Sequence, residues 1–296
     1  MSIQAYLFAG KIAARVREEA VTLIRPGAKV LDICQYVESR IEKLSGRPAF
    51  PCNISINHIA AHDTAGVEDE ASIQADDVVK LDLGVQIDGY IVDTALTVSL
   101  GRRYAELVAV TERALRGALE MIKEGITVGE IGALVEATAK SGGFKAISNL
   151  GGHNIERFQI HGGITIPNVR VPARQTLKRG GVYAVEPFLT TREGTGQVRE
   201  LPITKIYSLV SRRRLSAPEL NEMEELIWSR YRTLPFTSRW LIDTYGAKEL
   251  EQCLAQLARL GILRPYPVLM ESNSAVVAQF EHTITLTDNG ILVLTA

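Results

Sequence analysis

The chain has 296 residues and a formal net charge of −1, with 46% hydrophobic and 23% charged residues. This composition allows a substantial buried core, and a nearly neutral chain gives no overall electrostatic case for binding nucleic acid or a membrane surface. Three widely spaced cysteines (Cys34, Cys52 and Cys253) suit a reducing compartment. With no signal peptide and no apolar run of the ~18 residues that span a membrane, we expect a soluble cytoplasmic protein.

Two amphipathic helices are predicted at the start of the chain. Apolar side chains recur at helical spacing through residues 2–24, and Ser2 is placed to cap the N-terminus of this helix. The second helix covers about residues 29–45, and Gly46 is expected to end it.

The same pair of helices recurs later in the chain. A shift of 98 residues aligns several identical or similar residues, among them Arg15 with Arg113, Ala20 with Ala118, Gly27 with Gly125 and Ile33 with Ile131. A helix–turn–helix followed by strands therefore occurs twice, which predicts one domain with two pseudo-symmetric halves. His62 and His161 lie at nearly the same point of the two repeats.

Residues 78–99 are predicted to form a β-hairpin that turns at a central Asp-Gly dipeptide. Asp82 and Asp93 interrupt the apolar runs of its strands, where burial is costly unless something pairs the carboxylates. With a two-residue turn Asp82 faces Ala95, so Asp82 and Asp93 share one face, roughly 5–8 Å apart at Cβ. Two carboxylates placed in this way repel one another unless cations lie between them.

The periodicity of the repeat breaks at about residues 212–262. The arginines 212–214 lead into a predicted capping box that begins at Ser216, and a helical pattern follows. We predict a small helical insertion, so that 1–211 and 263–296 form the main domain and the arginines are a solvated boundary. A nucleic-acid or ribosome contact of these arginines is the alternative.

Five residues form a candidate metal site, four carboxylates and one imidazole: Asp82, Asp93, His153, Glu186 and Glu281. These donors suit hard or borderline divalent ions such as Mn²⁺, Fe²⁺, Co²⁺ or Zn²⁺. Two such ions can polarise a carbonyl and activate water at neutral pH. Each residue taken alone could be an ordinary surface charge or a satisfied core group, but the shared face of Asp82 and Asp93 favours a two-metal hydrolase.

Several segments resemble the type 2 methionine aminopeptidases. They are residues 77–89 with Asp93, residues 60–64, residues 152–163, residues 183–188 and residues 278–284. Their order and spacing hold over nearly the whole chain, the helical insertion is the mark of type 2, and the short N-terminus resembles the archaeal form. The resemblance implies the α+β "pita-bread" fold, whose two related halves agree with the repeat.

The resemblance also implies a metalloaminopeptidase that removes the initiator methionine from nascent proteins when the next residue is small. Asp82 would lie on the side of the first metal ion, and Asp93 and Glu281 would bridge both ions. His153 and Glu186 would complete the shell of the second ion. Glu186 would also carry a proton to the leaving amine.

Two histidines and a small apolar pocket follow from the same resemblance. His161 is expected to hydrogen-bond the developing oxyanion, and His62 to contact the scissile amide or the next residue. Phe50, Ile160 and Tyr266 are expected to line the pocket for the methionine side chain, with plain core packing as the alternative. Eukaryotic relatives carry a further histidine after the Glu186 segment, and residues 190–197 have none.

The implied partners are the N-termini of nascent polypeptides, with the ribosome as a further candidate. We expect a monomer with no membrane partner and no specific nucleic-acid partner. A proline dipeptidase of the same fold is the nearest rival interpretation, and the helical insertion argues against it. The second rival is a metal-free binding protein on this fold, and the complete set of ligand candidates argues against that.

Overall fold

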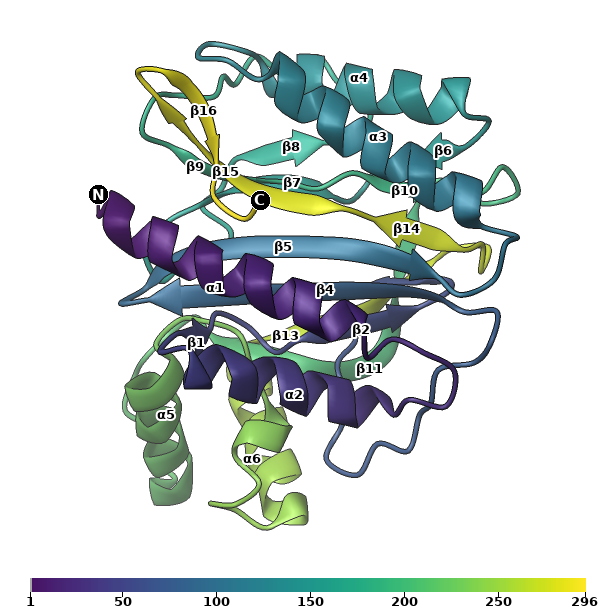
Figure 1. The fold of residues 1–296 in the computed structure, drawn as a ribbon. Coiled ribbons are helices and arrows are strands. Elements are labelled where there is room, and N and C mark those ends of the chain that lie inside the picture. Colours follow the sequence, from purple (N-terminus) through teal and green to yellow (C-terminus); the bar gives the residue numbers. More distant parts are fainter. Residues whose placement is uncertain (1) are drawn as a thin grey trace.

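The structure, a computed structural model, describes residues 2–296. Over this range the chain combines a long antiparallel sheet with the two repeated helix pairs packed on one side of it (Figure 1). The helices are α1 (Ile3–Val21), α2 (Val30–Lys43), α3 (Ala105–Met121), α4 (Val128–Ser141), α5 (Pro218–Tyr231), the 3₁₀ helix η1 (Ser238–Trp240) and α6 (Ala247–Arg259). None of these helices is long and apolar enough to cross a membrane, and this finding covers the described residues only.

The strands alternate with these helices along the chain. In chain order the first eight are β1 (Arg47–Pro48), β2 (Asn53–Ile56), β3 (Ile59–Ala61), β4 (Val78–Ile87), β5 (Tyr90–Ser99), β6 (Lys145–Ala146), β7 (Gly151–Ile155) and β8 (Thr165–Pro167). The later strands are β9 (Val182–Val185), β10 (Phe188–Thr190), β11 (Val198–Leu209), β12 (Phe236–Thr237), β13 (Leu263–Glu271), β14 (Val277–Gln279), β15 (Glu281–Thr287) and β16 (Gly290–Val293).

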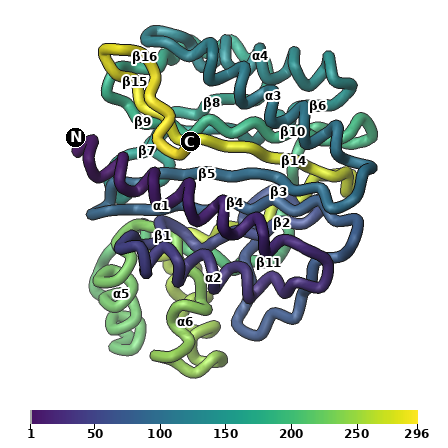
Figure 2. Tube along the Cα trace, in the orientation of Figure 1, coloured from purple at the N-terminus to yellow at the C-terminus, as the bar shows by residue number. Residues whose placement is uncertain are grey.

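The main sheet has the strand order β1-β4-β5-β15-β9-β7-β8, with β2 paired to β4 and β16 paired to β15. Strand β15, from the C-terminal end of the chain, therefore lies between β5 of the first half and β9 of the second. The tube in Figure 2 shows this late strand running across the middle of the molecule. Two smaller sheets have the orders β14-β10-β6 and β12-β11-β13-β3.

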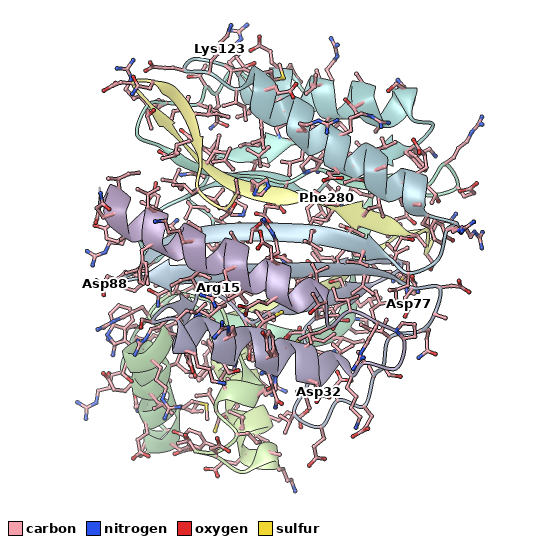
Figure 3. All side chains as sticks on the ribbon, in the orientation of Figure 1. Arg15, Asp32, Asp77, Asp88, Lys123 and Phe280 are labelled. Atoms are coloured by element: carbon pink, nitrogen blue, oxygen red, sulfur yellow. The ribbon has the colours of Figure 1, made fainter. Side chains whose placement is uncertain are left out.

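The predicted hairpin is confirmed in its register and in its turn. Asp82 pairs with Ala95, and Gly84 pairs with Asp93. Asp88 and Gly89 have φ values of 51° and 83°, as a type I′ turn requires. Figure 3 labels Asp88 at this end of the hairpin.

The repeated helix pairs are also confirmed. Adding 98 to both ends of α2 gives both ends of α4. Helices α1 and α2 pack with the first half of the sheet, and α3 and α4 pack with the second, each pair around a hydrophobic core of its own. The duplication seen in the sequence is thus a duplication of helix pairs on one continuous sheet.

Three details of the helix ends and one strand differ from expectation. Ser2 lies at the N-cap of α1, but its side chain makes no capping hydrogen bond. Helix α2 ends at a C-cap formed by Leu44, before Gly46. The N-cap of α5 is Ala217 and not Ser216, because Pro218 occupies the first helical position. The last ligand strand is interrupted at Phe280, which lies between β14 and β15 (Figure 3).

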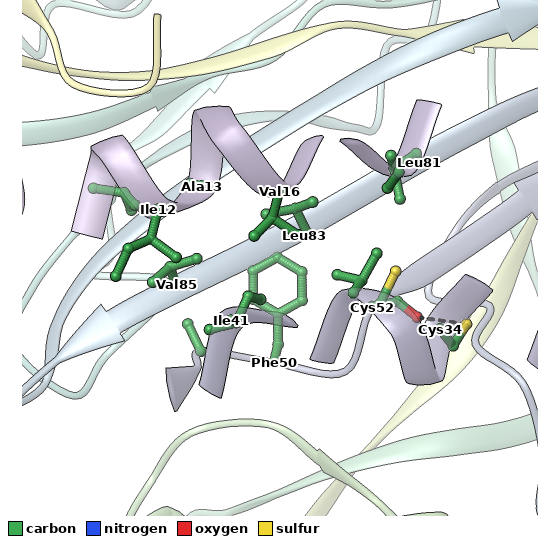
Figure 4. Close-up of a cluster of buried hydrophobic side chains, with 14 of the residues drawn as sticks. Ile12, Ala13, Val16, Cys34, Ile41, Phe50, Cys52, Leu81, Leu83 and Val85 are labelled. Atoms are coloured by element: carbon green, nitrogen blue, oxygen red, sulfur yellow. Dashed lines mark hydrogen bonds between the residues drawn. The ribbon is translucent and has the colours of Figure 1, made fainter. Parts of the chain in front are cut away.

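The alternation of side chains along β4 separates the core from the opposite face of the sheet. Leu81, Leu83 and Val85 point toward α1 and α2, where they meet residues such as Ile12 and Val16 (Figure 4). The even-numbered residues, Asp82 among them, point to the other face. The helices therefore leave that face free for a site.

Helices α5 and α6 share a third hydrophobic core with the ends of β11 and β13. The arginines 212–214 before α5 are exposed, and Arg212 pairs with Glu224 and Glu225. This agrees with a solvated boundary. The division into 1–211 with 263–296 and a separate insertion at 212–262 stays a prediction.

Candidate metal centre

The registers of three neighbouring strands bring the predicted carboxylates together. Ala95 of β5 pairs with Asp82 of β4 on one side and with Glu281 of β15 on the other. Paired residues in a sheet point to the same face, and so do residues two apart on a strand. Asp82, Asp93 and Glu281 therefore share the face that the helices leave free.

Two further strands complete the set. His153 of β7 pairs with Ala184 of β9, which pairs with Thr283 of β15. Thr283 follows Glu281 by two residues, and Glu186 follows Ala184 by two. The consecutive strands β4, β5, β15, β9 and β7 thus each bring one predicted ligand to the same face, with Glu186 directly after its strand.

The side chains of these residues lie close to one another. His153 Nε2 is 3.4 Å from Glu186 Oε1 and 3.9 Å from Asp93 Oδ2. Ligand atoms of Asp93, His153 and Glu281 all lie within 4.8 Å of one another. A hydrogen bond from Thr283 Oγ1 to the carbonyl oxygen of Asp93, at 2.7 Å, ties β5 to β15 beside the site.

The chemistry of the donor set fits a cation. Asp82 Oδ1, Asp93 Oδ1 and Glu281 Oε1 are buried and accept no hydrogen bond. Leaving a buried acceptor unpaired costs about 1–3 kcal/mol, and more for a charged group. Three such oxygens on one face are explained by divalent ions that they would coordinate.

The pKa values of these groups also indicate a cation site. Burial raises the pKa of Asp82 to about 7. Burial and repulsion from neighbouring carboxylates raise the pKa values of Asp93, Glu186 and Glu281 well above their usual range. Burial lowers the pKa of His153 to about 3, so its imidazole is neutral and has a lone pair to offer. The carboxylates need a cation to ionise together at neutral pH.

Both predicted histidines lie beside this cluster. The ring of His161 is 4.4 Å from the ring of His153, centroid to centroid. His62, which has a positive φ of 62°, places Nδ1 at 3.2 Å from the carbonyl oxygen of Pro267. Burial lowers the pKa of His161 to about 4 and also lowers that of His62. His62 is then neutral with its proton on Nδ1, the atom that faces the carbonyl, which leaves Nε2 as an acceptor.

The five ligand candidates and both histidines line one cavity of about 120 Å³. Phe50, Ile160 and Tyr266, the residues expected to line a methionine pocket, are among its walls. Phe50 packs over Gly84, where a Cβ atom would lie only 2.2 Å from the ring. Phe50 and Ile160 also belong to the hydrophobic core of the first half, so core packing and pocket lining are combined in these two side chains.

The cavity also has walls that the sequence did not indicate. Ile206 and Pro235 line it, and they come from β11 and from the segment after α5. Asn53, at the start of β2, lines it as well. Residues 190–197, where a further histidine is missing, do not take part. No local pattern marks Ile206 or Pro235, because only the folding of the later segments brings them to the sheet.

Comparison with known proteins identifies the class of protein. Residues 4–210 match the description "Metallopeptidase family M24". The chain belongs to this family of metallopeptidases, and the family agrees with the cluster of buried carboxylates and imidazole described above.

Curated relatives match the chain from end to end. A methionine aminopeptidase of Methanocaldococcus jannaschii is 42% identical over 298 residues, which cover 100% of each chain. A methionine aminopeptidase of Thermococcus onnurineus is 44% identical and covers 99% of each chain. One of Saccharolobus solfataricus is 44% identical over 98% of this chain and 96% of its own.

Solved structures share the fold at lower identity. A thermophilic Arx1 has a TM-score of 0.87 at 21% identity, covering 98% of this chain and 89% of its own. The methionine aminopeptidase of Thermotoga maritima has a TM-score of 0.72 at 24% identity, covering 99% and 96%. The prolidase of Pyrococcus furiosus has a TM-score of 0.64 at 18% identity, covering 99% and 63%. With the family match, these structures confirm the predicted pita-bread fold.

Proposed function

We propose that this protein is a methionine aminopeptidase that removes the N-terminal methionine from polypeptides when the next residue is small. The observation that carries the proposal is the set of five ligand candidates, one from each of five consecutive strands, on the wall of a small cavity. The full-length match to curated methionine aminopeptidases supports this activity over that of a proline dipeptidase.

The residues on the open face of the sheet would hold two divalent ions. Asp82 and His153 would bind one ion each, with Glu186 beside His153, and Asp93 and Glu281 would bridge the two. When bound there, the ions would polarise the scissile carbonyl and activate water for attack. The mixture of carboxylates and one imidazole is compatible with Co, Mn, Fe or Zn.

The remaining polar residues would orient the substrate and move protons. His161, neutral beside His153, would donate a hydrogen bond to the oxyanion that develops at the scissile carbonyl. His62 has a free Nε2 that would accept a hydrogen bond from the scissile amide or the residue after it. Glu186 would pass a proton to the leaving amine. Each role uses a group that lines the same cavity.

The cavity walls would select the methionine side chain. Phe50, Ile160, Ile206 and Tyr266 present an apolar surface, and a flexible thioether packs well against aromatic rings. Because no charged group is needed to recognise a thioether, analogues with norleucine in place of methionine should also be cleaved. A bulky residue after methionine would meet the His62 segment and should be rejected.

The direct test is a hydrolysis assay on Met-Ala-Ser and on Ala-Pro peptides, with and without a metal chelator. We expect cleavage of Met-Ala-Ser, its loss with chelator, and its recovery when Mn²⁺ or Co²⁺ is added in excess. Cleavage of the proline peptide alone would favour a proline dipeptidase. Binding of either peptide without turnover under all metal conditions would favour a non-catalytic protein of this fold.

We further propose that the protein acts in the cytoplasm as a monomer on the N-termini of nascent polypeptides. A ribosome contact would be sought first at the exposed arginines 212–214. Co-sedimentation with ribosomes, compared between the wild type and a variant with these arginines replaced by Ala, measures that contact.

A further inference from the structure

Asn53 lies next to the proposed metal centre, on an edge of the sheet that no proposed ligand occupies. It is the first residue of β2, and it pairs directly with Asp82 of β4. Paired residues point to the same face, so Asn53 extends the row of polar side chains by one strand. It lines the 120 Å³ cavity with them.

In the side-chain amide of Asn53 the nitrogen makes a hydrogen bond and the oxygen does not. Its Nδ2 donates a hydrogen bond to the carbonyl oxygen of Pro51 at 3.1 Å. Because a carbonyl oxygen can only accept, this bond determines which end of the amide is nitrogen. The other end, Oδ1, is buried and has no hydrogen-bond partner, on a side chain that is 5% exposed.

The unpaired Oδ1 of Asn53 calls for a donor from outside the chain. The paired residue, Asp82, is a carboxylate of the proposed metal centre, so its negative charge lies beside this amide oxygen. A carboxamide oxygen and a carboxylate oxygen on neighbouring strands together favour a group that is rich in N–H donors and positively charged. The side chain of methionine has no donor, and the scissile amide has a single uncharged N–H.

The free α-amino group of the substrate has the required chemistry, since it carries two or three donors and a full or partial positive charge. We propose that Asn53 Oδ1 accepts a hydrogen bond from the α-amino group of the bound substrate. This inference rests on the proposed aminopeptidase function. It assigns to Asn53 a share in distinguishing a free N-terminus from a blocked one.

The test compares two ligands of the metal-loaded protein that differ only in the amine. L-Methioninol carries the amino group, and 4-(methylthio)butan-1-ol lacks it. We expect Asn53→Leu, which keeps the approximate shape and removes the acceptor, to raise the Kd of L-methioninol about 10-fold in isothermal titration calorimetry. The Kd of the des-amino ligand and the metal content should stay unchanged. KM for Met-Ala-Ser should rise more than kcat falls.

Two further variants serve as an alternative and as a control. Asn53→Ala removes the same acceptor without added bulk, and it should show the same selectivity if the leucine variant fails to fold. Ser55→Ala is the matched control, because Ser55 is a buried, unpartnered polar residue on the same strand that does not line the cavity. We expect Ser55→Ala to bind both ligands like the wild type.

The contrary outcomes are distinct. An equal loss of affinity for both ligands would make Asn53 a packing residue, and a fall in metal content would make its oxygen a metal ligand; either result overturns the inference. If the wild type cleaves Met-Ala-Ser while either result is found, only the inference fails. If the metal-loaded wild type neither cleaves Met-Ala-Ser nor binds L-methioninol, the proposed function fails with it.

Discussion

At the scale of single residues, Asp93 is the carboxylate on which the proposed centre depends most. Its Oδ1 is buried without a hydrogen bond, and its Oδ2 lies 3.9 Å from His153 Nε2. Its backbone is held on both sides by Thr283, whose Oγ1 accepts from the N–H of Asp93 and donates to its carbonyl oxygen. The side chain is therefore positioned before any ligand arrives, as a bridging residue requires.

Asp93→Asn should abolish metal binding and turnover together, because the amide removes the charge while keeping the shape. Metal content by atomic absorption and kcat for Met-Ala-Ser measure the two effects. Asp88→Asn is the control, since Asp88 lies in the turn of the same hairpin, where Asn tolerates the positive φ. Normal turnover by Asp93→Asn would refute the proposed centre.

His161→Ala should separate chemistry from metal binding. The ring lies beside His153 but is proposed to contact the substrate, so metal content should remain close to that of the wild type. We expect kcat to fall by roughly 10²–10³, the effect of losing one oxyanion donor. His58→Ala, outside the cavity, serves as the control. A large loss of metal in His161→Ala would instead make this histidine a ligand.

At the scale of elements, a buried ion pair joins the segment after α5 to helix α2. Arg239 of η1 donates to both carboxylate oxygens of Glu38, at 2.6 and 2.9 Å, and Trp240 Nε1 donates to the same carboxylate at 2.9 Å. Both side chains of the ion pair are at most 10% exposed. These bonds fix the segment that contributes Pro235 to the cavity wall.

Arg239→Met should lower the free energy of unfolding by about 3 kcal/mol, because it leaves the Glu38 carboxylate buried without its partner. Urea denaturation followed by circular dichroism measures the change. Lys29→Met breaks the exposed ion pair with Glu70 and should lower the free energy of unfolding far less, because solvent screens an exposed pair. If both variants lost the same free energy of unfolding, the buried ion pair would stabilise the fold no more than the exposed one. In Arg239→Met, Glu38→Leu should recover part of the lost stability.

At the scale of the whole molecule, the site lies where the two halves meet. Asp82 and Asp93 belong to the first half, His153 and Glu186 to the second, and Glu281 to the strand between them. Bound metal would neutralise buried carboxylates from all three parts. Metal binding and global stability should therefore be coupled.

Removing the metal should lower the melting temperature of the entire protein. A metal held at about 100 times its Kd stabilises the folded state by about 2.7 kcal/mol, which corresponds to a shift of roughly 4–5 °C for a chain of this size. Differential scanning calorimetry with chelator and after re-addition of Mn²⁺ measures this. Asp93→Asn should not respond to the chelator. An unchanged melting temperature of the wild type would contradict a metal centre shared by both halves.

Much of the site follows from local sequence rules. The Asp-Gly turn sets an even loop length, which determines that Asp82 and Asp93 share a face, and the structure has this register. The helix repeat was readable because amphipathic periodicity repeats with it. The helix caps were less predictable: Thr127 forms a complete capping box, whereas Ser216 does not cap α5. Which residue caps a helix depends on the direction from which the preceding segment enters the helix, and this direction is set by the tertiary structure.

The sequence by itself determined the hairpin, the duplicated helix pairs and, through resemblance, the identity of the ligand candidates. Only the tertiary structure decided that β15 lies between β5 and β9, which aligns Glu281 with Asp82 through Ala95. It alone also placed Ile206 and Pro235 on the cavity wall and left the oxygen of Asn53 unpaired. The reason is physical: a turn and a helix are specified by neighbouring residues, whereas strand pairing across 186 residues, from Ala95 to Glu281, depends on packing that leaves no local pattern.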